Sequence, residues 1–126
     1  MDKTSTGFEV KKPEVLYASA RSFENIVFTS GQLPIDPITG NIVADNFAEQ
    51  ARQSLSNIRN IVINEGSCLN NLLKINVLLT DMINFPVFNE VYKNFFDDNE
   101  YPARTAYQVV ALPRNALVEI EAIFHK

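Results

Sequence analysis

The sequence is poor in the residues that build metal sites and disulfides. It contains one cysteine, Cys68, and one histidine, His125. A single cysteine cannot form an intramolecular disulfide, and these two residues cannot supply the ligands of an ordinary zinc site. A Ser–His or Cys–His catalytic pair also has no support, because His125 lies one residue from the end of the chain and outside every motif. We therefore expect no metal centre and no histidine-based nucleophile.

Excess basic charge and long apolar runs are also missing. The 126 residues include 11 Lys and Arg against 15 Asp and Glu, a formal net charge of −4. A nucleic-acid-binding protein with this balance would lack its electrostatic driving force. No apolar run approaches the ~20 residues of a membrane-spanning helix, and residues 1–5 are too polar for a signal peptide. These absences predict no nucleic-acid partner, no membrane span and a cytoplasmic location.

The composition is that of a folded globular protein. Hydrophobic residues make up 46% of the chain and charged residues 21%, which are ordinary values for a protein with a packed core. No internal repeat, low-complexity segment or linker divides the sequence. We therefore expect residues 1–126 to form a single domain.

Hydrophobic periodicity predicts strands, a helix, a strand, a second helix and two final strands. Strands are expected at residues 8–18, 25–33, 72–80, 104–112 and 116–124, with a short hairpin partner at 41–43. The first helix should begin near Asn46, where Asn46 and Glu49 have the form of a capping box, and end near Gly66. The second should run from about Asn84 to Asp97-Asp98-Asn99.

Alternation assigns the faces of the expected sheet. In the last strand, one set of residues should pack under the helices: Val118, Ile120, Ala122 and Phe124. The intervening residues should occupy the far face: Leu117, Glu119, Glu121 and Ile123. In the strand at 72–80, one face should carry Leu73, Ile75, Val77 and Leu79, and the other Leu72 and Leu78.

These faces predict an α+β sandwich, a mixed sheet of about six strands with two helices packed on one face. The far face would then carry Leu72, Leu78, Leu117 and Ile123. That is more apolar surface than suits exposure to water. We therefore expect the chain to form an oligomer through the far face of its sheet.

The C-terminal third holds the charged residues with the clearest chemistry. Arg104 lies at the start of a predicted strand, and Glu119 and Glu121 share one face of the last strand. A guanidinium fork holds a carboxylate in a fixed orientation, and a nearby glutamate can hold or activate a water molecule. Small acidic metabolites are therefore the first class of ligand to consider. The alternative is an ordinary ion-paired arginine and two solvated strand glutamates.

Several motifs occur together and in order along the chain. They include Ser30-Gly31-Gln32-Leu33-Pro34, Leu79-Thr80-Asp81-Met82, Pro102-Ala103-Arg104-Thr105 and Val118-Glu119-Ile120-Glu121-Ala122. With these motifs the chain resembles the RidA/YjgF family, the reactive-intermediate (enamine/imine) deaminases, from about Tyr17 to its C-terminus. The resemblance implies a chorismate-mutase-like fold and a homotrimer whose sheets face an interior barrel. It also implies three clefts between subunits and no metal or organic cofactor.

The resemblance further implies an activity and a set of site residues. The family hydrolyses 2-aminoacrylate, its tautomer 2-iminopropanoate and related imino acids to a 2-oxo acid and ammonia. By this resemblance Arg104 would bind the substrate carboxylate, and Glu119 would position or activate the attacking water. The cleft would also be lined by Tyr17, Ser30, Gly31, Asn89 and the main chain at Ala106.

Three departures from the family pattern bear on the site. Ala106 stands where many relatives carry a cysteine, which excludes thiol chemistry at that position. The segment Leu16-Tyr17-Ala18 replaces the family's Pro-Tyr-Ser, and Glu24 stands where a glycine is common. The last two changes affect the expected shape of the cleft mouth, and with it the substrate preference.

Two other functions remain open from the sequence. The same arginine would serve a non-enzymatic trimer that binds a carboxylate metabolite or regulates a partner protein. A ribonuclease or translation inhibitor is the third interpretation attached to this family. The acidic balance and the lack of a histidine pair argue against this third interpretation.

Overall fold

The computed structural model describes residues 15–126. Most of the strand expected at 8–18 therefore lies outside the described residues. The described part of that segment, residues 15–18, belongs to no strand.

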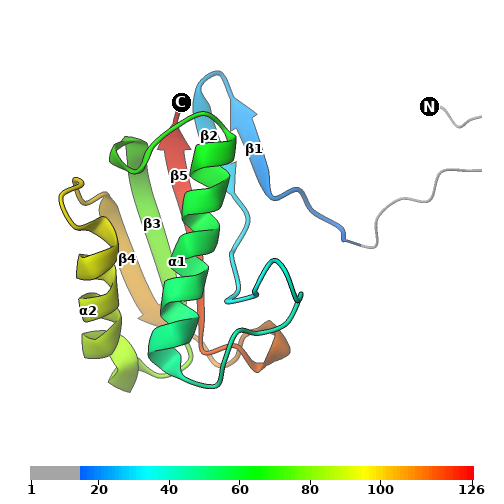
Figure 1. Cartoon of the computed structure of the whole chain (residues 1–126), viewed down its shortest axis with the longest axis vertical. Coiled ribbons are helices and arrows are strands. Elements are labelled where there is room, and N and C mark those ends of the chain that lie inside the picture. Colours follow the sequence, from blue (N-terminus) through cyan, green and yellow to red (C-terminus); the bar gives the residue numbers. More distant parts are fainter. Residues whose placement is uncertain (1–14) are drawn as a thin grey trace, which may run out of the picture.

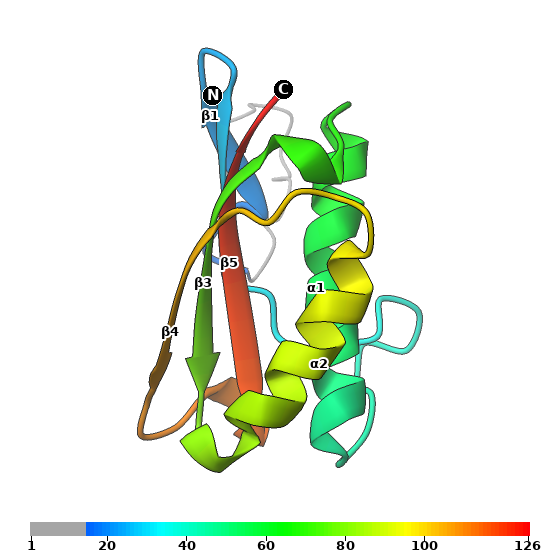
Figure 2. The same ribbon diagram turned by 90° about the vertical axis from the view of Figure 1, so that its left-hand side faces the viewer.

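The described residues form two layers, a mixed sheet with two helices on one face (Figures 1 and 2). The strands are β1 (Ala20–Phe23), β2 (Ile26–Thr29), β3 (Leu72–Leu79), β4 (Ala103–Gln108) and β5 (Val118–His125). Their order across the sheet is β1-β2-β5-β3-β4, with β3 and β4 parallel and the other pairs antiparallel. The helices are α1 (Phe47–Asn64) and α2 (Phe85–Phe96).

The α+β sandwich is confirmed, but within the described residues the sheet has five strands rather than about six. The expected partner at 41–43 forms a single isolated bridge, from Ile35 to Ile42, instead of a strand. The segment expected as one strand at 25–33 divides, because β2 ends at Thr29 and Gln32 then makes its own bridge to Ile120.

Strand β1 was not predicted from the sequence. It pairs with β2 through a tight turn at residues 24–25, where Glu24 adopts a φ of +55°. This left-handed conformation favours glycine, the residue that the family resemblance implies for this position. The residues of β1 are largely exposed, so they lack the apolar alternation by which a strand is recognised.

Helix α1 begins and ends where its sequence predicts. Asn46 is the N-cap, and its Oδ1 accepts a hydrogen bond of 3.0 Å from the Glu49 N–H. The Glu49 carboxylate pairs with Arg52 at 2.8 Å, instead of completing a capping box. At the other end Gly66 has a φ of +82° and its N–H bonds to Ile63, the pattern of a Schellman C-terminal motif.

Strand β3 differs from its prediction at its first two residues. Leu72 is 5% exposed and belongs to the core, whereas Leu73 is 44% exposed. The register with β5 shifts between Leu72 and Lys74, and a one-residue shift of this kind exchanges the faces of the side chains that precede it. From Ile75 onward the alternation follows the expectation.

The core lies between the helices and the near face of the sheet. The four residues of β5 expected there are all buried: Val118, Ile120, Ala122 and Phe124. The apolar stripe of α1 is buried against them: Phe47, Ala51, Leu55, Ile58 and Val62. Helix α2 adds Phe88, Val91, Tyr92 and Phe96, and Phe95 is partly buried. This packing fixes α2 above β3 and β4.

The far face of the sheet carries a mixture of apolar and charged side chains. Phe28 and Tyr107 are 49% and 47% exposed, and Glu119, Glu121 and Ile123 are half-buried. The expectation that Leu72 and Leu117 share this face was wrong for Leu72, and Leu117 also contacts the core. The remaining apolar side chains still leave an uncovered apolar surface on one side of the sheet.

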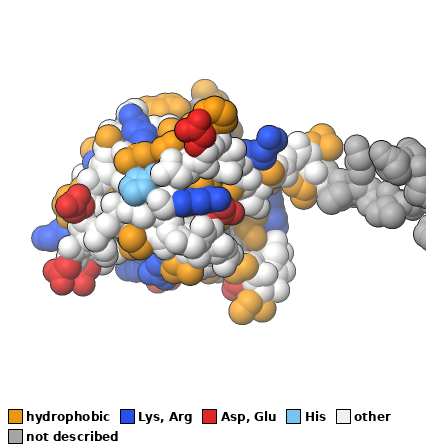
Figure 3. Space-filling view, turned by 90° about the horizontal axis from the view of Figure 1, so that it is seen from above, with side chains coloured by type: hydrophobic (Ala, Val, Ile, Leu, Met, Phe, Trp, Pro, Cys, Tyr) orange, Lys and Arg blue, Asp and Glu red, His pale blue; other side chains and the backbone are white. Residues whose placement is uncertain are grey.

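Charges of both signs are interspersed among apolar side chains at the end of the molecule seen in Figure 3. No helix formed by residues 15–126 is both long enough and apolar enough to span a bilayer.

Candidate functional site

Arg104 lies on β4, at one edge of the sheet, and its side chain projects beneath α2. It is in register with Ile75 of β3, a core residue, so both side chains lie on the helix side of the sheet. Its Nη1 donates a hydrogen bond of 2.9 Å to Oδ1 of Asn89 on α2. The structure thus brings together two residues, Arg104 and Asn89, that the sequence placed in the cleft.

The guanidinium of Arg104 is surrounded by aromatic rings of α2. Its central carbon lies 4.8 Å from the ring centroid of Tyr92, 5.3 Å from that of Phe85 and 5.9 Å from that of Phe88. No motif of the sequence assigned these three aromatic residues to the site. The spacing of residues 85, 88 and 92 predicts one helix face, but nothing in it indicates that this face meets an arginine.

A cavity of about 300 Å³ opens beside Arg104. It is lined by Asn89, Tyr92, Lys93, Tyr101, Pro102 and Arg104. No carboxylate lines it, and no ion pair between described residues involves Arg104. An arginine with a neutral hydrogen-bond partner and a cavity free of acidic groups retains its capacity to bind an anion.

Glu119 lies on β5 and faces the other side of the sheet. It is in register with Leu78, one step along β3 from the buried Val77 and Leu79. Burial raises the pKa of its carboxyl above the ordinary value of 4.5, and the neighbouring charge of Glu121 raises it further. A carboxyl with a raised pKa stays protonated to a higher pH than an exposed glutamate does, which favours proton exchange with a ligand.

Gly31 lies directly against the Glu119 side chain. A Cβ at Gly31 would overlap Oε2 of Glu119 and would lie 2.8 Å from its Cδ. The contact is set by Gln32, whose N–H donates to the Ile120 carbonyl at 2.6 Å and so fixes this segment beside β5. Glycine at position 31 therefore leaves the space that the Glu119 carboxylate occupies.

Glu121, the second far-face glutamate, has a partner within the chain. Its Oε2 accepts a hydrogen bond of 2.9 Å from Nδ2 of Asn76. The two residues line a separate hollow of about 110 Å³ with Lys74. The effect of Glu121 on the pKa of Glu119 comes from its charge.

Ser30 and Tyr17 lie at the same end of the molecule as Gly31. The Ser30 hydroxyl donates to the Ala18 carbonyl at 2.6 Å, which ties the chain after Tyr17 to the end of β2. Tyr17 is 66% exposed and lines a second cavity, of about 320 Å³, together with Gly31.

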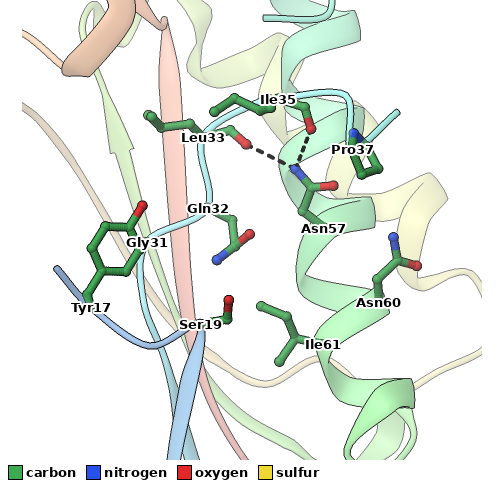
Figure 4. Close-up of a pocket in the computed structure, with 10 residues that line it drawn as sticks. All are labelled: Tyr17, Ser19, Gly31, Gln32, Leu33, Ile35, Pro37, Asn57, Asn60 and Ile61. Atoms are coloured by element: carbon green, nitrogen blue, oxygen red, sulfur yellow. Dashed lines mark hydrogen bonds between the residues drawn. The ribbon is translucent and has the colours of Figure 1, made fainter. Parts of the chain in front are cut away.

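This second cavity lies between the segment at 31–37 and α1 (Figure 4). Asn57 of α1 braces one wall, since its Nδ2 donates to the carbonyls of Leu33 at 3.1 Å and Ile35 at 3.0 Å. Its Oδ1 in turn accepts a hydrogen bond of 2.9 Å from Gln53. The cavity is lined by Tyr17, Ser19, Gly31, Gln32, Leu33, Ile35, Pro37, Asn57, Asn60 and Ile61, none of which is charged.

Ala106 lies on β4 two residues after Arg104. It pairs with Val77, and its side chain packs against the core. A contact between this residue and a ligand at the sheet edge would therefore involve the main chain, as the sequence suggested.

The residues proposed for the site form two separate groups within one chain. Arg104, Asn89 and Ala106 lie at the β4 edge on the helix side, whereas Glu119 lies on the far side of the sheet. Strand β3 separates β4 from β5, so the two strands are about 10 Å apart at the usual strand spacing. The bridge from Gln32 to Ile120 of β5 places the neighbouring Gly31 beside β5, not beside β4. One chain alone does not bring Arg104 and Glu119 to one small ligand.

Ligands for a metal ion do not gather in the described part of the chain, where no three His, Cys, Asp or Glu residues form a group that could hold one. Cys68 is free and exposed.

Comparison with known proteins places the chain in a family. The profile of the family described as "Endoribonuclease L-PSP" matches residues 9–126. The chain belongs to the RidA/YjgF family. A RutC family protein from Pyrococcus horikoshii is 44% identical over 115 residues, covering 91% of this chain and 90% of that protein.

Relatives with more specific names show similar identity. The 2-iminobutanoate/2-iminopropanoate deaminase of Mus musculus is 44% identical over 107 residues, covering 85% of this chain and 78% of that protein. The crystal structure of Escherichia coli TdcF with bound serine superposes with a TM-score of 0.84 at 40% identity, covering 93% of this chain and 91% of that one. The fold of this chain is therefore that of the RidA/YjgF proteins.

Proposed function

We propose that this protein is an imine/enamine deaminase that hydrolyses reactive 2-imino acids, such as 2-iminopropanoate and its tautomer 2-aminoacrylate, to 2-oxo acids and ammonia. It needs no metal or organic cofactor for this reaction. The mouse relative, with 44% identity, carries a deaminase name for 2-iminobutanoate and 2-iminopropanoate. In the cytoplasm such imines arise from pyridoxal-phosphate enzymes acting on serine or threonine.

One observation carries the proposal: among residues 15–126 the only hydrogen-bond partner of the Arg104 side chain is the neutral Asn89, beside a cavity that no carboxylate of the described residues lines. A guanidinium already paired with a carboxylate would have to lose that partner before it could bind a ligand. Arg104 needs no such exchange, and its remaining N–H donors suit a bidentate contact with a substrate carboxylate. Each charge-assisted hydrogen bond of this kind contributes roughly 1.5–3 kcal/mol.

The separation of the two residue groups supports a ring of subunits. Arg104 lies at the β4 edge, and the Gly31–Glu119 contact lies beyond the other side of β3. A head-to-tail contact can bring the first group of one chain to the second group of its neighbour, and such contacts close into rings. We propose a homotrimer with three intersubunit clefts, in which the uncovered apolar sheet faces line an interior barrel.

The proposed chemistry follows from these positions. Arg104 of one subunit holds the substrate carboxylate and so orients the adjacent C=N bond. A water molecule held by Glu119 of the neighbouring subunit adds its oxygen to the imine carbon, and the imine nitrogen gains a proton. The tetrahedral intermediate then expels ammonia as the C=O bond forms. Overall one C=N bond and one water molecule give one C=O bond and ammonia.

Glu119 would act in this sequence as the group that moves protons. Its raised pKa keeps a fraction of the carboxyl protonated nearer to neutral pH than an exposed glutamate would be. The carboxylate form accepts a proton from the attacking water, and the acid form returns a proton to the departing nitrogen. The imine is already electrophilic, so the site needs orientation and proton transfer rather than a strong nucleophile.

The test generates 2-aminoacrylate from serine with a dehydratase and follows the loss of the imine. The wild-type protein should accelerate that loss, and Arg104→Ala should remove most of the acceleration. Arg59→Ala is the matched control, because Arg59 also lies over an aromatic ring, that of Phe95 at 5.5 Å, outside both cavities. No acceleration by the wild-type protein, or full activity of Arg104→Ala, would refute the proposal.

A non-enzymatic trimer that binds a carboxylate metabolite is the second candidate, since it would use the same arginine and cavity. Tight binding of several 2-oxo acids, with no turnover of any imino acid, would favour it. The family description also contains the word endoribonuclease. The net charge of −4 argues against RNA as a substrate, and an RNA-cleavage assay at low salt tests that directly.

A further inference from the structure

We propose that Tyr92 is a positioning residue for Arg104: its ring, with those of Phe85 and Phe88, holds the guanidinium in the orientation needed to bind a carboxylate. The inference rests on the proposed function, because it concerns the arginine that would bind the substrate. It assigns to the aromatic face of α2 a role that core packing alone does not require.

The geometry is that of a cation held over ring faces. All three centroids lie within 6 Å of the guanidinium carbon, at 4.8 Å for Tyr92, 5.3 Å for Phe85 and 5.9 Å for Phe88. This is the range in which cation–π attraction operates, and it strengthens as the pair is removed from water. Tyr92 is the nearest of the three and should contribute most.

The rings take the place that an acidic side chain usually takes beside an arginine. Asn89, the hydrogen-bond partner of Arg104, is neutral, and no ion pair among residues 15–126 includes Arg104. A carboxylate partner would orient the guanidinium but would also compete with an anionic ligand. Ring faces orient it while leaving its positive charge and its in-plane N–H donors available.

Tyr92 is itself held firmly. It is 5% exposed, stacks on Tyr101 with 5.9 Å between centroids and 9° between planes, and lies 4.7 Å from the ring of Phe96. Because Tyr101 and Phe96 restrict the ring of Tyr92, that ring can restrict the guanidinium that lies against it. The position of Arg104 is therefore set through a continuous aromatic cluster rather than by one flexible contact.

The ring of Tyr92, and not its hydroxyl, carries this role. The hydroxyl is buried and makes no hydrogen bond with any described residue. Burial raises its pKa to about 12, so it stays protonated and does not act as a phenolate counter-ion for Arg104. Removal of the hydroxyl should therefore leave ligand affinity unchanged, whereas removal of the ring should not.

The experiment measures the affinity of 2-oxobutanoate, a stable 2-oxo acid, by titration calorimetry of the assembled protein. Tyr92→Phe should bind within about twofold of the wild type. Tyr92→Leu should bind about 3- to 30-fold more weakly, the range expected for loss of a cation–π contact. In kinetics with a 2-imino acid, KM should rise by a similar factor, with a smaller change in kcat.

A matched control separates positioning from loss of core packing. Val91 lies beside Tyr92 on α2, is 6% exposed and belongs to the same core. Its aliphatic side chain has no ring and cannot make a cation–π contact with Arg104. Val91→Ala should lower thermal stability without weakening the binding of 2-oxobutanoate. In the Arg104→Ala background, Tyr92→Leu should cause little further loss, because the residue it positions is gone.

Two results would overturn the inference. One is wild-type affinity in a folded Tyr92→Leu protein. The other is an equal loss from Tyr92→Leu with and without Arg104, which would show a general effect on the fold. Wild-type affinity in Arg104→Ala would instead refute the proposed carboxylate site itself, so the failures of the two proposals are distinguishable.

Discussion

Replacing Gly31 with alanine tests whether the position of the Glu119 carboxylate matters for activity. Gly31 does not adopt a positive φ, unlike Gly40 and Gly66, so alanine fits its backbone conformation. The added Cβ would nevertheless overlap Oε2 of Glu119 and lie 2.8 Å from its Cδ. The Glu119 side chain, which is flexible at its end, must therefore move while the main chain stays in place.

The magnitude follows from the size of the displacement. Optimal carbon–carbon separation is about 3.5 Å, so the Glu119 carboxyl carbon, 2.8 Å from the added Cβ, must retreat by about 0.7 Å. Displacement of a catalytic group by ~1 Å costs up to about 100-fold in rate. We expect Gly31→Ala to lower kcat/KM by about 10- to 100-fold, or about 1.4–2.7 kcal/mol of transition-state stabilisation.

Stability should move in the opposite direction. A glycine replaced by alanine at a compatible φ commonly stabilises a protein by about 0.4–1 kcal/mol, since the unfolded chain has fewer conformations to lose. The assay therefore combines imine hydrolysis with urea denaturation of the same preparation. Gly66→Ala is the control, because its φ of +82° makes alanine strained in open space; it should lose about 1 kcal/mol and keep its activity.

Two results would contradict these expectations for Gly31→Ala. Unchanged kcat/KM in Gly31→Ala would mean that the position of the Glu119 carboxylate does not limit the reaction. A large loss of stability together with activity would mean that the backbone, rather than the Glu119 side chain, gave way to the new methyl group.

Two further predictions concern pH and the wall of the second cavity. Because the pKa of Glu119 is raised, the folded protein binds a proton at the Glu119 carboxyl more tightly than the unfolded chain does. The free energy of unfolding should therefore fall as pH rises from about 4.5 through the raised pKa, relative to Glu119→Gln. Glu121→Gln should lower the pKa of Glu119 in a side-chain NMR titration. An unchanged pKa would contradict the contribution assigned to the charge of Glu121. Asn57→Leu removes the hydrogen bonds to the Leu33 and Ile35 carbonyls. Urea denaturation should show a loss of stability of about 2–4 kcal/mol. A loss below ~0.5 kcal/mol would show that these two hydrogen bonds contribute little to the stability of the protein.

Local sequence patterns were sufficient to predict most of the fold. The stripe of α1, its Asn46 cap and its Gly66 stop all depend on residues within a few positions of one another. The alternation of apolar and polar residues in β5 likewise predicted which face of the strand is buried. Elements whose signal lies in neighbouring residues are therefore recoverable from one sequence.

The errors arose where pairing, rather than pattern, decides the structure. The shift of register near Leu72 depends on how β3 meets β5, and Leu72 and Leu73 are the same residue type. Strand β1 owes its place to pairing with β2 across Glu24. No periodicity within either segment carries that information.

The candidate site was likewise predicted only in part from the sequence. The motifs named the charged residues, Arg104 and Glu119, but not their placement on opposite sides of one sheet. Nor did they indicate that Tyr92 would lie against Arg104, because an aromatic residue at helical spacing is equally expected in a core. Contacts between distant segments had to come from the three-dimensional structure.

We propose that a working site joins Arg104 of one subunit to Glu119 of another. It is tested most directly by assembling Arg104→Ala and Glu119→Gln chains together in equal amounts, after showing that each variant alone is inactive. With random assembly of a ring, a site is complete when its arginine comes from one variant and its glutamate from the other, which gives about a quarter of the wild-type sites. Activity near that fraction is the predicted result. Mixed assemblies as inactive as the separate variants would contradict the account, because the two residues would then have to come from the same chain.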